Sequence, residues 1–506
     1  MAPRRPLVQS GGDLRELSAA DWLTRPGGWV DCSGMTTAAE VNAAAAAAAA
    51  GSTIWLGARP ASAPLVCNET LIVRPFQRWL GAGGRQMLTV IQAGASLPAG
   101  APLMAALGWT TSGNVADDPI HVSGIHFDLA GRTGRHGLVV FNFWSHFEDL
   151  QFAGVTGSTA CCIRVTDRAS DGSDSSNSHS ENTFVRIRVN GTSGGAHGFW
   201  AESNNGLSNQ DGHLVDSFFA GVTGYACYIG RAAGWTVENN HFYGTGENAI
   251  ELGACYATKV IGNYVEDFGA NNATTGPVSG YYTGINMTFL DGRGSVLANN
   301  SVSLLQPTPT WSGNRLVAIG LRAGSGQLDA AVVVSGNNVT HANPAASGAT
   351  TQAFRVGEGG DSGRMLHVRW AGNGIHPRAE FTTPIDRHEP TTRVWSTDEP
   401  FARAYSGVTG TWTLDAYECT RRVTGTLTGD TTLAAPTNGS DGVEIQLVLW
   451  ASGAQRILTF DAGLERLGGV LASYTIPSGR KARVSLRCST VDGTTDWIVE
   501  AAGVTQ

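Results

Sequence analysis

The sequence is poor in charge, and its charges are mixed rather than clustered. Charged residues make up 15% of the 506 residues, and 34 Lys and Arg stand against 42 Asp and Glu, for a formal net charge of −8. A nucleic-acid-binding surface needs a basic patch or stripe, and no basic cluster occurs in the chain. We therefore expect no nucleic-acid partner.

Long, bulky apolar runs and metal-ligand spacings are also missing. The longest alanine run, residues 43–50, lacks the large side chains of a membrane span, and the opening MAPRRPLVQS has neither the apolar core nor the cleavage site of a signal peptide. We expect no membrane insertion and no secretory export. The 8 Cys form no Cys-x-x-Cys motif, and no His-x-x-x-His spacing occurs, so we expect buried thiols, no metal and no cofactor.

What the chain does have is glycine, 66 residues of it, and a repeated asparagine. Each repeat of the asparagine is followed two positions later by an apolar residue, and the intervals are 23, 37, 37 and 36 residues. Repeats of this length indicate coils that stack strand on strand, as in a parallel β-helix. The five positions are Asn240, Asn263, Asn300, Asn337 and Asn373.

The asparagines have a local physical reason. Asn tolerates the left-handed backbone of a tight bend, and its amide can accept a hydrogen bond from one neighbouring coil while donating to another. Upstream, the same position is occupied by Ile125, Leu150, Ile187 and Ser217. Nine coils can be counted in this way, enough for a rod roughly 40 Å long.

A second repeat, a short apolar run once per coil, runs in phase with the first. Because side chains alternate along a strand, the inward residues of these runs fix their outward neighbours. The inward residues are Ile163, Phe199, Cys227, Ile250 and Ile285, and the outward ones are Arg164, Trp200, Tyr228, Glu251 and Asn286.

One helix is predicted, before the coils. Thr37 and Glu40 form a capping box, residues 38–50 are strong helix formers, and Gly51 can end the helix. The helix would cover the open end of the solenoid. The Ala-rich helix, then Thr53-Ile-Trp-Leu-Gly57 and Leu80-Gly-Ala-Gly-Gly84, resembles the entry to the pectate-lyase-like right-handed β-helix superfamily, which is common in bacteriophage tailspikes. The resemblance spans roughly residues 36–380 and concerns architecture rather than chemistry.

The repeat is expected to stop in a polar stretch that contains Pro384, Pro390 and Pro400. Alternating strands follow and predict an antiparallel β-sandwich, which resembles the small β domain that ends many phage tail fibres and tailspikes. The fold class is thus all-β, with three parts: an attachment or leader segment at 1–35, expected to be irregular, a β-helix at 36–390, and a C-terminal domain at 391–506. The resemblance implies that this last domain trimerises the protein or binds the host.

The outward residues suggest a glycan-binding strip. Aromatic rings stacked at strand spacing offer platforms for sugar rings, while Arg, Asn and carboxylates can satisfy hydroxyls. We predict Arg164, Trp200, Tyr228 and Asn286 as glycan-binding residues. Long loops at 165–182, 201–213, 266–283, 303–316 and 341–351 are expected to wall the strip. The alternative is that the aromatic residues are covered by loops or by a second subunit.

Hydrolysis of a glycosidic bond needs two carboxylates, one of them protonated. Glu202 and Glu251 are the predicted catalytic pair, with Glu247, Asp211, Glu266 and Asp267 as further candidates; a solvated turn residue is the alternative for each. The polygalacturonase-type motifs of enzymes with this fold are largely absent, and only Asp117-Asp118 and Arg186-Ile187-Arg188 match. The lone histidines His197 and His241 point to no site.

Three functions are compatible with these patterns. The first is a phage or prophage tailspike that recognises host cell-surface polysaccharide, with or without depolymerase activity. As the resemblance implies, it would be a homotrimer, attached through its N-terminus to tail or baseplate proteins, assembled in the host cytoplasm and located in the virion. The second is a polysaccharide hydrolase or lyase of the pectate-lyase-like class. The third is a structural rod that spaces a C-terminal receptor-binding domain.

Overall fold

A computed structural model describes most of the chain and shows two compact units. The described residues are 7–10, 13–16, 28–84, 86–110, 119–174, 180–202, 210–269, 281–290, 294–305, 315–323, 330–341, 350–358, 366–376, 381, 383–387, 392–396, 403–414, 422–437, 444–491 and 494–505. Unit 1 comprises residues 1–326, 338–356 and 375–386, and unit 2 comprises 327–337, 357–374 and 387–506.

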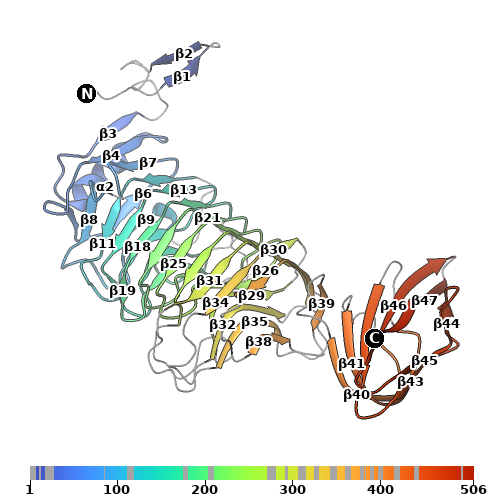
Figure 1. Ribbon diagram of the computed structural model, residues 1–506. Coiled ribbons are helices and arrows are strands. Elements are labelled where there is room, and N and C mark those ends of the chain that lie inside the picture. The colour runs from blue at the N-terminus through green and yellow to red at the C-terminus, as the bar shows by residue number, and fades with distance from the viewer. Residues whose placement is uncertain are drawn as a thin grey trace. The chain divides into compact units, whose positions relative to one another are not determined.

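Unit 1 is the predicted parallel β-helix, built from three parallel sheets whose strands stack side by side (Figure 1). In unit 1, sheet 1 contains β3 (Trp29–Asp31), β4 (Thr53–Gly57), β7 (Arg78–Gly81), β10 (His121–Ser123), β13 (His146–Glu148), β17 (Thr183–Val185), β21 (His213–Val215), β24 (Thr236–Glu238), β27 (Lys259–Ile261) and β30 (Ser295–Ala298). Sheet 2 contains β5 (Leu65–Cys67), β8 (Val90–Ala93), β11 (His126–Asp128), β14 (Gln151–Ala153), β18 (Arg188–Asn190), β22 (Phe218–Ala220), β25 (His241–Tyr243), β28 (Tyr264–Glu266), β31 (Ser301–Leu304), β34 (Asn338–His341) and β37 (Gly374–Ile375).

Sheet 3 carries the predicted site. It contains β6 (Leu71–Val73), β9 (Pro102–Ala106), β12 (His136–Val140), β16 (Cys161–Val165), β20 (His197–Ala201), β23 (Cys227–Ile229), β26 (Ile250–Cys255), β29 (Tyr281–Phe289), β32 (Arg315–Ala323), β35 (Thr350–Glu358) and β38 (Thr383–Arg387). Sheets 2 and 3 have 11 strands each, so the count of nine coils was too low. The repeat also continues past Pro384, which lies within β38 and not in a linker.

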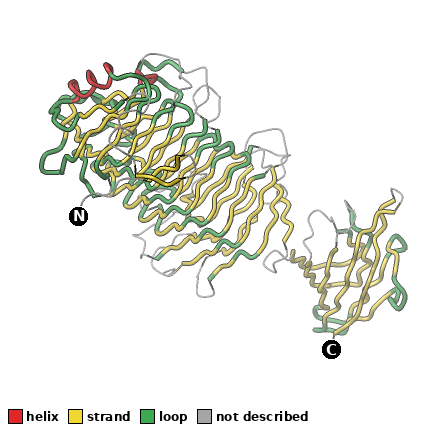
Figure 2. Tube along the Cα trace, turned by 90° about the horizontal axis from the view of Figure 1, so that it is seen from above, coloured by secondary structure: helices red, strands yellow, loops and turns green. Residues whose placement is uncertain are grey.

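Smaller elements complete unit 1. The helix α2 (Ala38–Ala47) has the predicted capping box, and it ends before residue 50. Asn42 of α2 donates to Thr70 O and accepts from Ile72 N, both at 2.9 Å, so the helix covers the edge strand β6 (Figure 2). The other elements are α3 (Leu107–Thr110), the parallel pair β15 (Val155–Thr156) and β19 (Thr192–Ser193), and the antiparallel pair β1 (Leu7–Ser10) and β2 (Asp13–Glu16), which corrects the expectation of an irregular leader.

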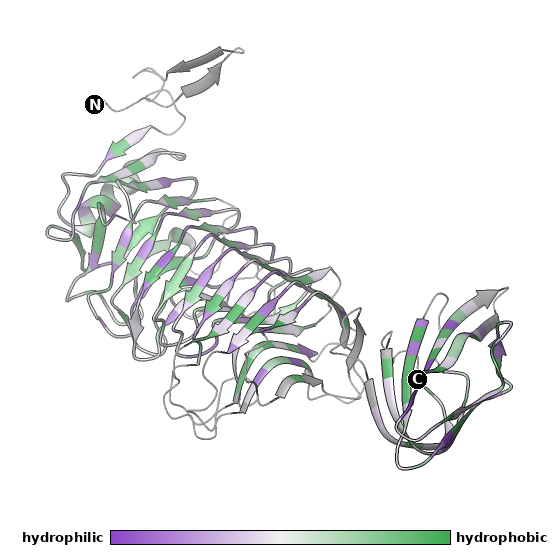
Figure 3. Ribbon diagram, in the orientation of Figure 1, coloured by the Kyte–Doolittle hydropathy of each residue, from purple (hydrophilic) through white to green (hydrophobic). Residues whose placement is uncertain are grey.

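The interior of the β-helix is formed by residues that repeat in register. Apolar and polar residues alternate along its strands (Figure 3), and the predicted inward residues are all 0% exposed. Aromatic side chains stack inside, as in Phe127 on Phe152, with ring centroids 4.7 Å apart, and Phe219 on Phe242, at 5.2 Å. The seven described cysteines are all buried, as expected.

Unit 2 has two parts in its described residues. The parallel strands β33 (Ala330–Ser335), β36 (Leu366–Ala371) and β39 (Thr392–Ser396) form the first, and the second is a sheet of 8 strands around its own apolar core. The eight are β40 (Arg403–Trp412), β41 (Arg422–Leu433), β42 (Glu444–Ala451), β43 (Arg456–Phe460), β44 (Leu464–Arg466), β45 (Ser473–Ile476), β46 (Lys481–Val491) and β47 (Thr494–Thr505).

The C-terminal β domain is therefore confirmed, but its strand pairing is mixed rather than wholly antiparallel. The long strand β41 pairs in parallel with β42 through its first half and with β43 through its second half. Alternation in a sequence predicts strands without predicting their direction. The boundaries expected at residues 35 and 390 remain predictions.

The asparagine ladder is confirmed in detail. Asn263 Oδ1 accepts from the backbone N of Asn240 at 3.1 Å and from its Nδ2 at 3.0 Å, and Asn263 Nδ2 donates to Val237 O and to Asn300 Oδ1, both at 2.9 Å. Ser217 begins the ladder, because its N donates to Asn240 Oδ1 at 2.9 Å. These bonds satisfy polar groups that are buried at the corner between sheets 1 and 2.

We expected the asparagine to be the left-handed residue at this corner. In the structure, the left-handed residue is instead the one before it. In every coil from β10 to β36 that position has a positive φ between 52° and 70°. The residues are Gly124, Asp149, Arg186, Asp216, Asn239, Gly262, Asn299, Gly336 and Gly372. The bend is thus made one residue early, which leaves the asparagine side chain free to face the next coil.

We predict that Asn263→Ala destabilises the β-helix. The substitution removes the five hydrogen bonds of the Asn263 side chain and leaves buried backbone and amide groups without partners, which costs on the order of 2–3 kcal/mol. Urea unfolding followed by circular dichroism would show a lower midpoint. Asn338→Ala, at an exposed position, is the control and should leave the midpoint unchanged; equal midpoints for both variants would contradict the ladder's role.

Candidate functional site

The outward positions of sheet 3 form one continuous row. The register pairs Arg164 with Trp200, Trp200 with Tyr228, Tyr228 with Glu251, and Glu251 with Asn286. Strand by strand, this is the alignment predicted from the sequence. The row continues at one end to Val139 and at the other to Gly320.

Two aromatic rings occupy the middle of the row. Trp200 and Tyr228 stack with centroids 4.1 Å apart and an interplanar angle of 20°. Tyr225 lies edge-on to both, at 5.8 and 5.5 Å, and the His197 ring lies 4.5 Å from Trp200. Trp200 and Tyr228 are half-buried. The neighbours hold the stack rigid while part of each ring faces outward.

Glu202, just after β20, accepts hydrogen bonds from three side chains. Arg164 bonds Oε1 through Nε at 2.9 Å and through Nη2, Thr166 Oγ1 donates at 2.8 Å, and Trp200 Nε1 donates to Oε2 at 3.1 Å. The carboxylate therefore balances the Arg164 charge and also orients the Trp200 ring. These contacts suit an ionised carboxylate.

Glu251 has a different environment. Its side chain is buried and accepts from two neutral amides, Asn286 Nδ2 at 2.9 Å and Asn248 Nδ2 at 2.7 Å. Burial raises the pKa of the Glu251 carboxyl to about 7, against the lowering effect of these amides and of the Arg322 charge. Asn286 is itself 0% exposed, so it positions Glu251 and does not meet solvent.

Glu202 and Glu251 thus have the different environments that distinguish the two carboxyl groups of an acid–base pair. One is held by an arginine, and the other keeps a proton up to about neutral pH. Glu202 directly follows β20 and Glu251 lies on β26, with β23 alone between the two strands, which places their backbones roughly 10 Å or more apart. The carboxyl groups of inverting glycosidases are separated by roughly 6.5–9.5 Å, within reach of two long side chains on such backbones.

The other acidic candidates lie in turns. Glu247 precedes β26 and is half-buried, and burial raises the pKa of its carboxyl. Asp211 is exposed in the turn before β21 of sheet 1. Glu266 ends β28 of sheet 2, and Asp267 follows it, with Oδ1 accepting from Leu305 N at 2.7 Å. Only Glu247 adjoins the row, and its charge, like that of Glu251, helps burial to raise the pKa of Tyr225.

A pocket of about 430 Å³ opens at one end of the row. It is lined by Arg164, Trp200 and Glu202, together with His136, His197 and Cys161. His136 and His197 each begin a strand of sheet 3, and burial lowers their pKa values to about 3 and about 4. Both are therefore neutral at physiological pH.

The two histidines were not predicted as site residues. His197 Nδ1 accepts from Tyr225 N and its Nε2 lies 3.1 Å from Ser158 O, so the neutral ring carries its proton on Nε2. His197 lies two residues before Phe199, so alternation assigns it to the inward set and gives no sign that its ring lies beside Trp200. The loops that were predicted to flank the row lie largely outside the described residues, at 175–179, 203–209, 270–280, 306–314 and 342–349. Asp117 and Asp118 also lie outside the described residues, in the range 111–118.

A second aromatic row, also unpredicted, lies on sheet 2. Phe218, His241 and Tyr264 follow one another in register, with centroids 5.1 and 4.7 Å apart, and Arg188 lies over the Phe218 ring at 5.6 Å. This second row supplies matched control positions for the row on sheet 3.

No protein-family model matches the sequence, and a search of curated proteins finds no match. Among solved structures, the chain is similar to the mannuronan C-5 epimerase AlgE4 A-module of Azotobacter vinelandii, with 11% identity, 74% of this chain and 98% of that chain covered, and a TM-score of 0.43. It is also similar to the Acinetobacter phage vb_AbaP_AS12 gp42 tailspike, with 10% identity, 90% and 77% covered, and a TM-score of 0.40. The Streptococcus pneumoniae surface adhesin PfbA gives 10% identity, 71% and 94% covered, and a TM-score of 0.39.

We predict that Glu251 makes stability depend on pH. In the folded protein the pKa of the Glu251 carboxyl is raised from 4.5 to about 7. The protonated carboxyl therefore contributes its full stability below pH 4.5, and this contribution is lost as the pH rises through 7. The unfolding free energy of the wild type relative to Glu251→Gln should therefore fall by roughly 3 kcal/mol between pH 4 and pH 8. Denaturant unfolding at several pH values measures this difference. The exposed Glu465→Gln is the control; a difference for Glu251→Gln that does not change with pH would overturn the assignment.

Proposed function

We propose that the protein is a phage or prophage tailspike, a receptor-binding tail protein that recognises host cell-surface polysaccharide through sheet 3. The observation that carries the proposal is the half-buried Trp200–Tyr228 stack, set in a row with Arg164 and Glu251 and next to a pocket of about 430 Å³. Flat rings with polar groups at their edges suit the faces and hydroxyls of sugars.

The row also suits a polymer better than a small molecule. Its residues are spaced at strand intervals, roughly 4.8 Å, and they continue over several coils of the β-helix. Consecutive sugar units of one chain can then contact consecutive positions. Arg164 is balanced by Glu202, so the row favours polar or weakly acidic sugars over strongly anionic ones.

We further propose a depolymerase activity for the same row. Glu251, which holds a proton up to about pH 7, would act as the general acid on the glycosidic oxygen, and Glu202 would act as the carboxylate that activates water. The alternative within this class is a pectate-lyase-like hydrolase or lyase that is free of any virion. Both versions place the chemistry on sheet 3.

The remaining parts of the chain are given the roles expected of a tailspike. Residues 1–35 would attach to tail or baseplate proteins, and residues 391–506 would trimerise the chain or bind the host, in a homotrimer located in the virion. The separate apolar core of the C-terminal sheet supports treating it as a module. In the described residues no helix is long and apolar enough to cross a membrane.

We predict that Trp200→Ala weakens polysaccharide binding by about tenfold or more, because it removes the larger ring of the stacked platform, worth roughly 1.4 kcal/mol. Binding of isolated host capsular and cell-wall polysaccharide, measured by biolayer interferometry, tests this. Tyr264→Ala, which removes an aromatic ring from sheet 2, is the matched control. Equal binding by the wild type and Trp200→Ala would exclude the row as the receptor site.

We predict that Glu251→Gln lowers polysaccharide cleavage by at least roughly 100-fold while binding is kept, because the general acid is lost. Wild-type cleavage should decline as the pH rises past about 7. New reducing ends, or unsaturated products in the case of a lyase, report cleavage, and the Glu465→Gln variant is the control. Binding without any product in the wild type would leave an adhesin rather than an enzyme.

Deletion of residues 401–506 separates the tailspike from a structural rod. If the β-helix binds receptor, the shortened chain still binds polysaccharide, and its affinity still depends on Trp200. Loss of all host binding in the shortened, folded chain would instead assign recognition to the C-terminal domain.

A further inference from the structure

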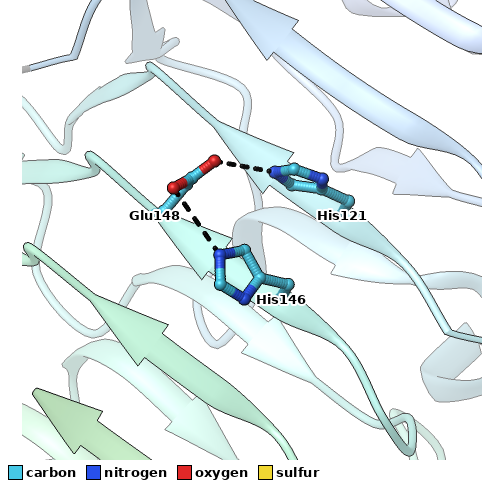
Figure 4. Close-up of side chains that lie close together, drawn as sticks. All are labelled: His121, His146 and Glu148. Atoms are coloured by element: carbon cyan, nitrogen blue, oxygen red, sulfur yellow. Dashed lines mark ion pairs between the residues drawn. The ribbon is translucent and has the colours of Figure 1, made fainter. Parts of the chain in front are cut away.

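Two histidines and a glutamate meet on the outer face of sheet 1, away from the row on sheet 3 (Figure 4). His121 lies on β10 and is directly opposite His146 on β13, and Glu148 lies two residues beyond His146 on the same side of the strand. His121 Nε2 is 3.3 Å from Glu148 Oε1, and His146 Nε2 is 3.6 Å from Glu148 Oε2. One ligand atom from each residue lies within 4.8 Å of the other two.

We propose that His121, His146 and Glu148 form a binding site for one divalent transition-metal ion of the zinc type. Two imidazole nitrogens and a carboxylate oxygen are ligands that such ions prefer, with bonds of about 2.0–2.2 Å. Three atoms within 4.8 Å of one another can surround an ion after small rotations of their side chains. This site is independent of the proposed polysaccharide row.

The backbone already holds the three residues in place. Parallel pairing of β10 with β13 fixes the two histidines side by side, and the T-shaped contact of their rings, with centroids 5.2 Å apart, limits their rotation. His121 Nε2 is buried and makes no aligned hydrogen bond, although Glu148 is close. The His146 side chain is 40% exposed, so an ion can enter and a water can complete its coordination.

Two positively charged arginines lie next to the ligand residues and should lower the affinity of the site for the ion. Arg78 Nη2 lies 3.3 Å from His121 Nδ1. Because an arginine can only donate, it favours the form of His121 whose proton is on Nε2. Metal binding at Nε2 requires that proton to move to Nδ1 and the exposed Arg78 to turn away. Arg186 donates to Glu148 Oε2 at 2.8 Å, but it is also held by both oxygens of Asp149, which leaves Glu148 Oε1 for the ion.

The test uses the full chain without a histidine tag, stripped with chelator and titrated with Zn²⁺ by calorimetry and with Co²⁺ by visible absorption. We expect one ion per chain, and tetrahedral Co²⁺ bands without thiolate charge-transfer absorption. His146→Ala and Glu148→Gln should each weaken binding at least tenfold. Arg78→Gln should strengthen it, because the variant loses a positive charge and offers an oxygen to a proton on Nδ1.

His241→Ala is the matched control. His241 Nε2 also lies close to a glutamate, 3.7 Å from Glu266 Oε2, but in the described residues no second histidine joins that pair. The control should bind Zn²⁺ like the wild type, and circular dichroism should show that every variant is folded. Absence of stoichiometric binding to the wild type, thiolate bands with Co²⁺, or binding that survives both His146→Ala and Glu148→Gln would overturn the proposal.

Discussion

The constraint on which the rest of this structure depends is the parallel register of its coils. Each coil stacks on the next with residue opposite residue, so a position in one coil becomes a column through many. Any side chain must then be compatible with a like neighbour at roughly 4.8 Å. Amides, flat rings and branched aliphatic chains meet this demand, because each can contact a copy of itself, whereas a column of like charges would repel.

The same rule explains why the fold could be predicted so largely from the sequence. The asparagines mark one corner of each coil, and counting from them fixes which residues of the next strand point inward, because alternation has a period of two. Phe199 and Ile250 are inside and Trp200 and Glu251 outside for this reason alone. Alternation carries no information on the direction of a strand, as around β41, where the pairing is parallel. Nor does it fix the residue at which the chain bends: the left-handed residue is Gly262 and not Asn263, as had been expected.

The candidate site shows a different limit. Register predicted which residues share a row, but not what they touch. Arg164 was expected to meet a ligand, yet it binds Glu202, and Asn286 was expected at the surface, yet it is buried on Glu251. His121 and His146 escaped notice because they are 25 residues apart in coils that have no ladder asparagine. Coil lengths vary, so no fixed spacing in the sequence could have revealed them; only the strand pairing brings them together.

The two glutamates of the row have different partners, although the chain has few charged residues. Glu202 is neutralised by an arginine, and Glu148 and Asp149 share Arg186 in the same way. Glu251 is bonded instead by two neutral amides and is buried, which disfavours its ionised form. An apolar residue at that position would avoid this cost, but it would take an acceptor away from the buried amides of Asn248 and Asn286. Glu251 therefore serves the packing of sheet 3, and its raised pKa is in addition what the acid role proposed for it requires, since groups with strongly shifted pKa values gather at functional sites.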